Sequence, residues 1–203
     1  MMNPYRCVGV LVASLLVPTS TAGPAGAFHG VVLADGRPVE GAVVYVEVDS
    51  GETLGITVPD TVIVDQRGLR FIPAVVAGRP GLTVEFLNSD PILHNVFSPG
   101  WSREPFDLGT YPSNTSRRHT FVQSGPHIIL CHVHPEMVAY VVVVATPLHA
   151  VTDSEGGFRI ENLPAGPHRV EIWRRGFEPV GQSVSVPVTG NLAVTLELSD
   201  LEE

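Results

Sequence analysis

The chain has 203 residues, with 12 basic and 21 acidic residues and a formal net charge of −9. Every basic residue is arginine, and an acidic balance of this kind excludes the electrostatic footprint of a nucleic-acid-binding protein. The 20 glycines and 18 prolines are typical of many short strands joined by turns, so we expect an all-β fold with one or two sandwiches.

The N-terminus has the pattern of a secretory signal peptide. Residues 1–6 carry one positive charge, residues 8–17 form an apolar run too short to span a bilayer, and Ala25-Gly26-Ala27 offers a small-residue cleavage site. We therefore expect residues 1–27 to be removed, leaving a periplasmic or secreted protein without a membrane span. The alternative is a buried N-terminal strand or a retained anchor, which the prolines and small residues of this segment disfavour.

The next segment, residues 28–52, carries a recognisable strand-opening motif. It reads Gly30-Val31-Val32, followed by Gly36-Arg37-Pro38-Val39-x-Gly41-Ala42-x-Val44-x-Val46. This segment resembles the opening of a carboxypeptidase regulatory-like (transthyretin-like) β-sandwich.

Between residues 62 and 144, short alternating apolar runs are separated by turns rich in glycine, proline and asparagine. Alternation of this kind predicts strands with one face buried. The predicted strands cover residues 62–64, 71–73, 82–86, 119–121, 127–131 and 138–144. Together they predict a Greek-key sandwich.

One cluster of residues in this region has the ligand types of a blue copper site. Cys131, His134 and Met137 follow each other closely after an apolar run, and His94 lies upstream. Two imidazoles, one thiolate and a weak axial thioether suit copper in both oxidation states. Once residues 1–27 are removed, Cys131 is the sole cysteine, and a lone thiol in an oxidising compartment favours metal ligation. A buried structural thiol is the alternative.

Several short motifs occur here in the order seen in one protein family. They are Phe71-x-Pro73, Gly81-x-x-Val84-x-Phe86-x-Asn88-x-Asp90, His94-Asn95-Val96-Phe97, Gly125 six residues before Cys131, and C-x-x-H-x-x-M. In this order they resemble the plastocyanin/amicyanin-like cupredoxins. The resemblance implies one type 1 copper ion held by His94, Cys131, His134 and Met137, with Asn95 joining the two ligand loops by hydrogen bonds.

The ligand loop departs from the amicyanin pattern at two positions. Val133 stands where amicyanin-like loops usually have proline, and His132 follows the cysteine as in multicopper oxidases. Those oxidases need further His-x-His pairs, and the sequence contains only the pair formed by His132 and His134. An oxidase or nitrite reductase is therefore disfavoured by the number of ligands, and we expect no enzyme.

The C-terminal segment supplies the missing half of the first motif. Thr152-Asp153-x-x-Gly156-x-Phe158-x-Ile160-x-Asn162-Leu163-Pro164-x-Gly166 resembles the closing part of the carboxypeptidase regulatory-like family. We expect residues 28–52 and 148–200 to form one smaller sandwich, with the cupredoxin domain, residues 53–147, inserted in a loop. Its core would contain Val44, Val46, Phe158, Ile160, Val170 and Ile172. Unrelated N- and C-terminal extensions are the alternative.

Two strands of the predicted cupredoxin are apolar on both faces. Alternation directs one set of residues toward the metal-binding core: His127, Ile129, Cys131, Ala139, Val141 and Val143. The opposite set is also apolar: Ile128, Leu130, Tyr140, Val142 and Val144. We expect this outer face to be covered by the second sandwich or by another subunit.

These features predict an exported mononuclear copper protein that carries single electrons through the edge of His134. Its expected partners are exported redox proteins such as c-type cytochromes or dehydrogenases, docking on an apolar surface around Pro91, Ile92, Leu93, Pro99 and Pro135. The alternative is a copper storage, delivery or sensing protein whose second sandwich contacts carbohydrate or mediates adhesion.

Overall fold

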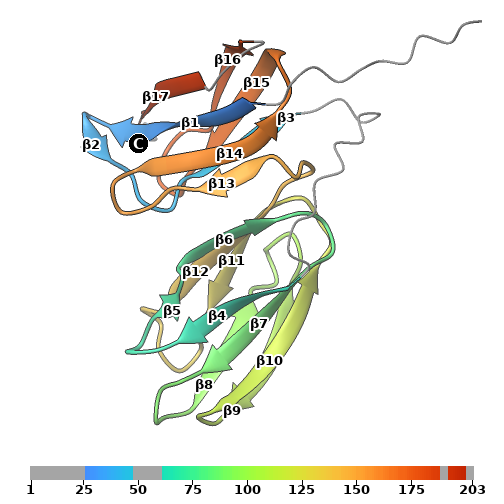
Figure 1. The fold of residues 1–203 in the computed structure, drawn as a ribbon. Coiled ribbons are helices and arrows are strands. Elements are labelled where there is room, and N and C mark those ends of the chain that lie inside the picture. The colour runs from blue at the N-terminus through green and yellow to red at the C-terminus, as the bar shows by residue number, and fades with distance from the viewer. Residues whose placement is uncertain (1–25, 48–60, 188–191, 200–203) are drawn as a thin grey trace, which may run out of the picture.

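The computed structural model describes residues 26–47, 61–187 and 192–199. Its 17 strands form two β-sandwiches, one above the other in Figure 1. The expected all-β class is confirmed. In this part of the chain, no helix has the length and hydrophobicity needed to cross a membrane.

The lower unit in Figure 1, here called the central sandwich, is built by residues 61–143. One sheet has the strand order β10 (Thr115–Phe121), β7 (Leu82–Asn88), β4 (Thr61–Gln66) and β5 (Phe71–Ile72). The other has the order β6 (Val75–Gly78), β12 (Val138–Val143), β11 (Gly125–Leu130), β8 (His94–Ser98) and β9 (Phe106–Tyr111). The chain crosses repeatedly between the two sheets, as expected for a Greek-key sandwich.

The core of the central sandwich follows from strict alternation along its strands. In β7, Leu82, Val84 and Phe86 are buried, while Thr83 and Glu85 between them are partly exposed. A period of two places successive side chains on opposite faces of a sheet. The same alternation buries Ile129, Ala139, Val141 and Val143 on the facing sheet, which matches the predicted inward set.

The upper unit, here called the terminal sandwich, combines strands from both ends of the described chain. One sheet has the order β14 (Gly157–Leu163), β1 (Gly26–Ala34) and β17 (Leu192–Leu198), with β2 (Arg37–Pro38) paired to β1. The other has the order β13 (His149–Val151), β3 (Val43–Glu47), β15 (Gly166–Trp173) and β16 (Val180–Val186). β1 pairs with β14 in antiparallel and with β17 in parallel orientation.

The six residues expected to share a core do lie in one buried cluster of the terminal sandwich: Val44, Val46, Phe158, Ile160, Val170 and Ile172. The pairing of β3 with β15 places Val46 opposite Val170. Phe28 and Phe158 add an edge-to-face ring contact with centroids 5.1 Å apart. The N-terminal strands therefore belong to the same hydrophobic core as the C-terminal ones.

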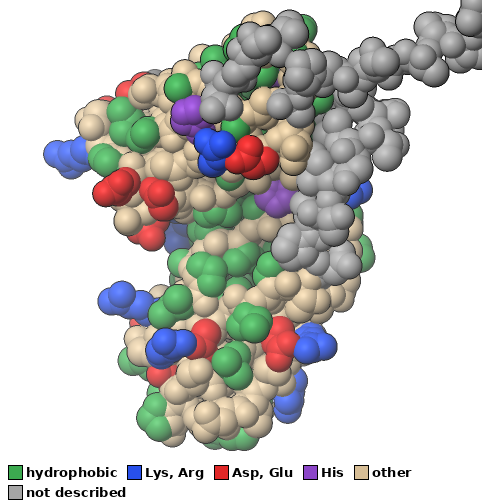
Figure 2. All heavy atoms as spheres, in the orientation of Figure 1, with side chains coloured by type: hydrophobic (Ala, Val, Ile, Leu, Met, Phe, Trp, Pro, Cys, Tyr) green, Lys and Arg blue, Asp and Glu red, His purple; other side chains and the backbone are tan. Residues whose placement is uncertain are grey.

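A third buried cluster joins the two sandwiches. Val142 and Val144 on the outer face of the central sandwich pack with Val43 of the terminal sandwich. Tyr140 of β12 and Trp173 of β15 extend this contact, with ring centroids 5.3 Å apart. The apolar outer face of β12 is thus covered from within the same chain. Beside this contact, the space-filling view shows the surface hollowed between the two units (Figure 2).

Some expectations are corrected or remain open. Ile128 and Leu130 are only half-buried and belong to none of the three clusters, so the cover reaches β12 but not all of β11. β6, β8 and β9 were not predicted as strands. The boundary between residues 52 and 53, and most of the expected signal peptide, lie outside the described residues. Gly26 and Ala27 of the expected cleavage site are the first residues of β1, and cleavage after Ala27 stays a prediction.

Candidate metal centre

Two neighbouring strands bring the predicted ligands together at one end of the central sandwich. His94 is the first residue of β8, and Cys131 directly follows the last residue of β11. These strands are antiparallel, with Leu130 opposite Phe97, so the start of β8 lies beside the chain leaving β11. His134 and Met137 lie in the connection from β11 to β12. The sheet register therefore gathers residues that are far apart in the sequence.

Three donor side chains converge at this point. The Nδ1 atoms of His94 and His134 are 3.0 Å apart, and Nδ1 of His94 lies 4.0 Å from the Cys131 sulfur. The ligand atoms of all three residues lie within 4.8 Å of one another. The two imidazole rings meet edge to face at 66°. Among the described residues, this is the one group of three or more His, Cys, Asp or Glu side chains with such convergence.

These separations fit a single metal ion. Metal–nitrogen bonds of about 2 Å and metal–sulfur bonds of about 2.3 Å place donors of one ion roughly 3 to 4 Å apart. The His94 and His134 nitrogens and the Cys131 sulfur have that spacing. A soft thiolate with two imidazoles is a donor set that selects copper or zinc over hard cations. The cluster resembles a type 1 copper site.

Met137 lies close to these donors inside the same core. Its side chain is 1% exposed and belongs to the buried cluster that contains Cys131. The Met137 amide donates a 3.0 Å hydrogen bond to the His134 carbonyl, which closes the ligand loop into a tight turn. Burial keeps water away from the thioether, a donor type that copper accepts as a weak ligand.

Asn95 connects the two ligand segments, as the resemblance implies. Its side-chain oxygen accepts a hydrogen bond from the His132 amide at 3.3 Å, and its Nδ2 donates to Asp107 at 2.7 Å. The His132 ring stacks on Phe97 with centroids 3.6 Å apart and lies 3.5 Å from the Asp107 carboxylate. His132 therefore has its own partners outside the donor cluster. The role of Asp107 was missed, because only the β8–β9 pairing brings it near Asn95.

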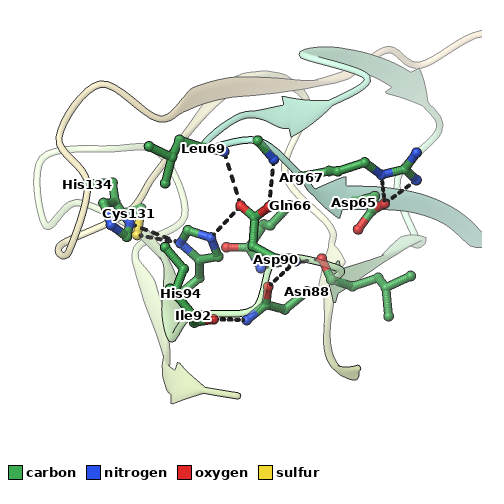
Figure 3. A network of polar contacts seen from close by, with 12 residues as sticks. Asp65, Gln66, Arg67, Leu69, Asn88, Asp90, Ile92, His94, Cys131 and His134 are labelled. Atoms are coloured by element: carbon green, nitrogen blue, oxygen red, sulfur yellow. Dashed lines mark hydrogen bonds and ion pairs between the residues drawn. The ribbon is translucent and has the colours of Figure 1, made fainter. Parts of the chain in front are cut away.

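The Asp90 carboxylate contacts the His94 ring on the side away from Cys131, as the close-up in Figure 3 shows. Its Oδ2 lies 2.9 Å from Nε2 of His94, the ring nitrogen that faces away from Cys131. Burial alone would raise the pKa of Asp90, but hydrogen bonds from the Leu69 amide, His94 and the Gly68 amide outweigh it, and the pKa lies below its usual value. In the sequence Asp90 appears only within a family motif, with no signal that it contacts a ligand.

Exposed apolar residues lie next to the two histidines of the donor cluster in the sequence, before buried His94 and on either side of half-buried His134. Pro91, Ile92, Leu93, Val133 and Pro135 are all exposed, and we call them the apolar rim. Four of the five expected docking residues belong to it. Pro99 does not, because β8 separates it from His94 by five residues, which is about 16 Å along a strand. Val133 was not expected in this surface.

Comparisons with known proteins match parts of the chain. The family model of the carboxypeptidase regulatory-like domain matches residues 136–199. This match begins in the ligand loop and includes β12 of the central sandwich, whereas it does not reach β1 and β3. A search of curated proteins finds no match.

Among solved structures, the chain is similar to several variants of amicyanin. A reduced variant and a Cu(I) variant each show 19% identity and a TM-score of 0.40, covering 50% of this chain and 98% of the amicyanin chain. An oxidised variant has 18% identity with the same coverage and TM-score.

Proposed function

We propose that this protein binds one copper ion through His94, Cys131 and His134, with Met137 as a weak axial ligand, and carries single electrons. The observation that supports this most directly is the convergence of the two imidazoles on the Cys131 thiol. Copper bound there would cycle between Cu(I) and Cu(II).

Rigid donors favour electron transfer over copper exchange. His94, Cys131 and Met137 are each 3% exposed or less, and the sheet register fixes the first two. Packing and hydrogen bonds from neighbouring residues hold these donor side chains in place. The donors therefore move little when the charge of the bound metal changes. A copper carrier instead needs a site that opens to an incoming acceptor. Burial therefore favours the electron carrier over storage, delivery or sensing.

The route for electrons in this proposal is the partly exposed ring of His134. It is the one proposed ligand that reaches the surface, since His94, Cys131 and Met137 are buried. The apolar rim would let a partner approach without removing charged groups from water. We propose exported redox proteins such as c-type cytochromes or dehydrogenases as partners, and a periplasmic or secreted location.

The test is to load the purified protein with Cu(II) and follow its visible spectrum and electrochemistry. One equivalent of Cu(II) should produce an intense blue band and a reversible one-electron wave. Transfer of the bound copper to a chelator should be slow. A colourless complex, or rapid transfer to the chelator with no reversible wave, would contradict the electron carrier and support the delivery alternative.

A further inference from the structure

The orientation of the His94 ring is set by a carboxylate on its far side. Nε2 of His94 lies 2.9 Å from Oδ2 of Asp90, while Nδ1 faces His134 and Cys131. A neutral imidazole carries one N–H, and a carboxylate only accepts hydrogen bonds. The proton therefore resides on Nε2, and the Nδ1 lone pair is free for a metal.

Asp90 is itself fixed by the hairpin between β4 and β5. The Gly68 amide donates to its Oδ1 at 2.7 Å, and the Leu69 amide donates to its Oδ2 at 3.0 Å. The Asp90 amide donates to Asn88 Oδ1 at 3.0 Å. With the side chain 11% exposed, these contacts leave the carboxylate little freedom to turn away from His94.

The hairpin adopts an unusual backbone conformation to make these contacts. Gly68 has φ 61° and Leu69 has φ 59°, and Leu69 is one of the few non-glycine residues with positive φ. A leucine rarely occupies the left-handed region, so an outlier here needs a compensating interaction. Successive amides in such a turn point to one side and bind an anion. The Asp90 carboxylate is that anion, held by both amides.

We propose that Asp90 is a positioning residue of the metal centre, clamped by the Gly68 and Leu69 amides so that it fixes the His94 tautomer and strengthens Nδ1 as a donor. This rests on the proposed copper function. A carboxylate behind a ligating histidine raises the basicity of that ligand, and its loss typically weakens metal binding by about 10- to 100-fold. Because a stronger donor favours Cu(II) over Cu(I), Asp90 should lower the reduction potential.

The first test needs no metal. In metal-free wild-type protein, at a pH where the ring is neutral, long-range ¹H–¹⁵N correlation spectra should show His94 as the Nε2–H tautomer. A mixture of tautomers, or Nδ1–H, would overturn the inference whether or not the protein binds copper. This measurement involves no substitution and so does not depend on a variant that folds.

The second test compares Asp90→Asn with Asp65→Asn in the copper-loaded full-length chain. Asp65 is a buried carboxylate on β4 that pairs with Arg67 and makes no contact with His94, so it controls for the loss of one charge. Asp90→Asn should weaken Cu(II) binding about tenfold relative to Cu(I), which is about 59 mV upward in potential. Equal potentials in the two variants would overturn the inference. Failure of wild-type protein to bind copper would instead overturn the proposed function.

Discussion

The sulfur of Cys131 lies 4.0 Å from Nδ1 of His94, although 37 residues separate them in the chain. If both bind one copper ion, the thiolate is the source of the visible colour. Cys131→Ser should abolish the intense absorption, because a hydroxyl cannot supply that charge transfer. The measurement is the visible spectrum after addition of Cu(II). A variant that kept an intense band near the red end of the visible range would show that Cys131 is not a ligand.

Met137 should act as a weak ligand whose loss changes the potential more than the affinity. Met137→Leu keeps an apolar side chain of similar volume, so the core should remain packed. Copper and colour should persist while the reduction potential rises, because removing a donor disfavours Cu(II) more than Cu(I). Cyclic voltammetry measures the shift. An unchanged potential would assign the axial position to another group, and complete loss of copper would assign Met137 a role in holding the loop.

The contact between the sandwiches can be tested at Val142, which is 2% exposed and packs in the buried cluster that joins them. Val142→Asp would bury a carboxylate without a partner, lowering the free energy of unfolding by about 3 kcal/mol and separating the two units. Small-angle X-ray scattering should show a larger radius of gyration. The matched control is Val122→Asp, because Val122 is 61% exposed. If both variants keep the wild-type radius, the junction does not hold the sandwiches together.

The Glu104 carboxylate should make the free energy of unfolding depend on pH in the acid range. Burial would raise its pKa, but hydrogen bonds from the Gln123 and Val122 amides and from His119 outweigh it, so the pKa lies below the ordinary 4.5. A lowered folded pKa means that the stabilisation is present above about pH 4.5 and is lost as the pH falls through the folded value. Glu104→Gln should cost about 1 to 3 kcal/mol at pH 7.

The same loss should shrink as the pH falls through the folded pKa of Glu104, because the wild-type carboxylate then becomes protonated as well. Urea unfolding of wild type and Glu104→Gln in a pH series from 7 downward measures the difference. A difference that stays constant over the whole series would show that the ionised carboxylate does not contribute.

The sequence was sufficient to predict the parts of this molecule that depend on local pattern. Alternation along β11 and β12 predicted the metal-side core of both strands and the covered outer face of β12, because a period of two assigns each side chain to one face, whereas the outer face of β11 is only half-buried. The spacing of Cys131, His134 and Met137 predicted a ligand loop, and the structure places Cys131 and His134 in one donor cluster with His94.

The contacts that could not be predicted depend on how strands far apart in the sequence pair with one another. Asp107 reaches Asn95 only because β9 pairs with β8, and Asp90 contacts His94 while held by a hairpin more than twenty residues earlier. No local signal in the sequence specifies these pairings. The parallel contact of β1 with β17 is likewise set by the closure of the terminal sandwich, not by either strand alone.

That parallel contact also bears on the order in which the chain can fold during synthesis. β1 is paired along its length, from Phe28 opposite Leu192 to Ala34 opposite Leu198, with the last strand described. The central sandwich, residues 61–143, leaves the ribosome complete before β13, β14, β15 and β17, the long-range strand partners of β1 and β3, have emerged. Since domains generally fold as units as they emerge, β1 and β3 are synthesised first but should be among the last strands to form their native pairs. A nascent chain stalled before residue 192 should therefore hold a folded central sandwich and a protease-sensitive N-terminal segment.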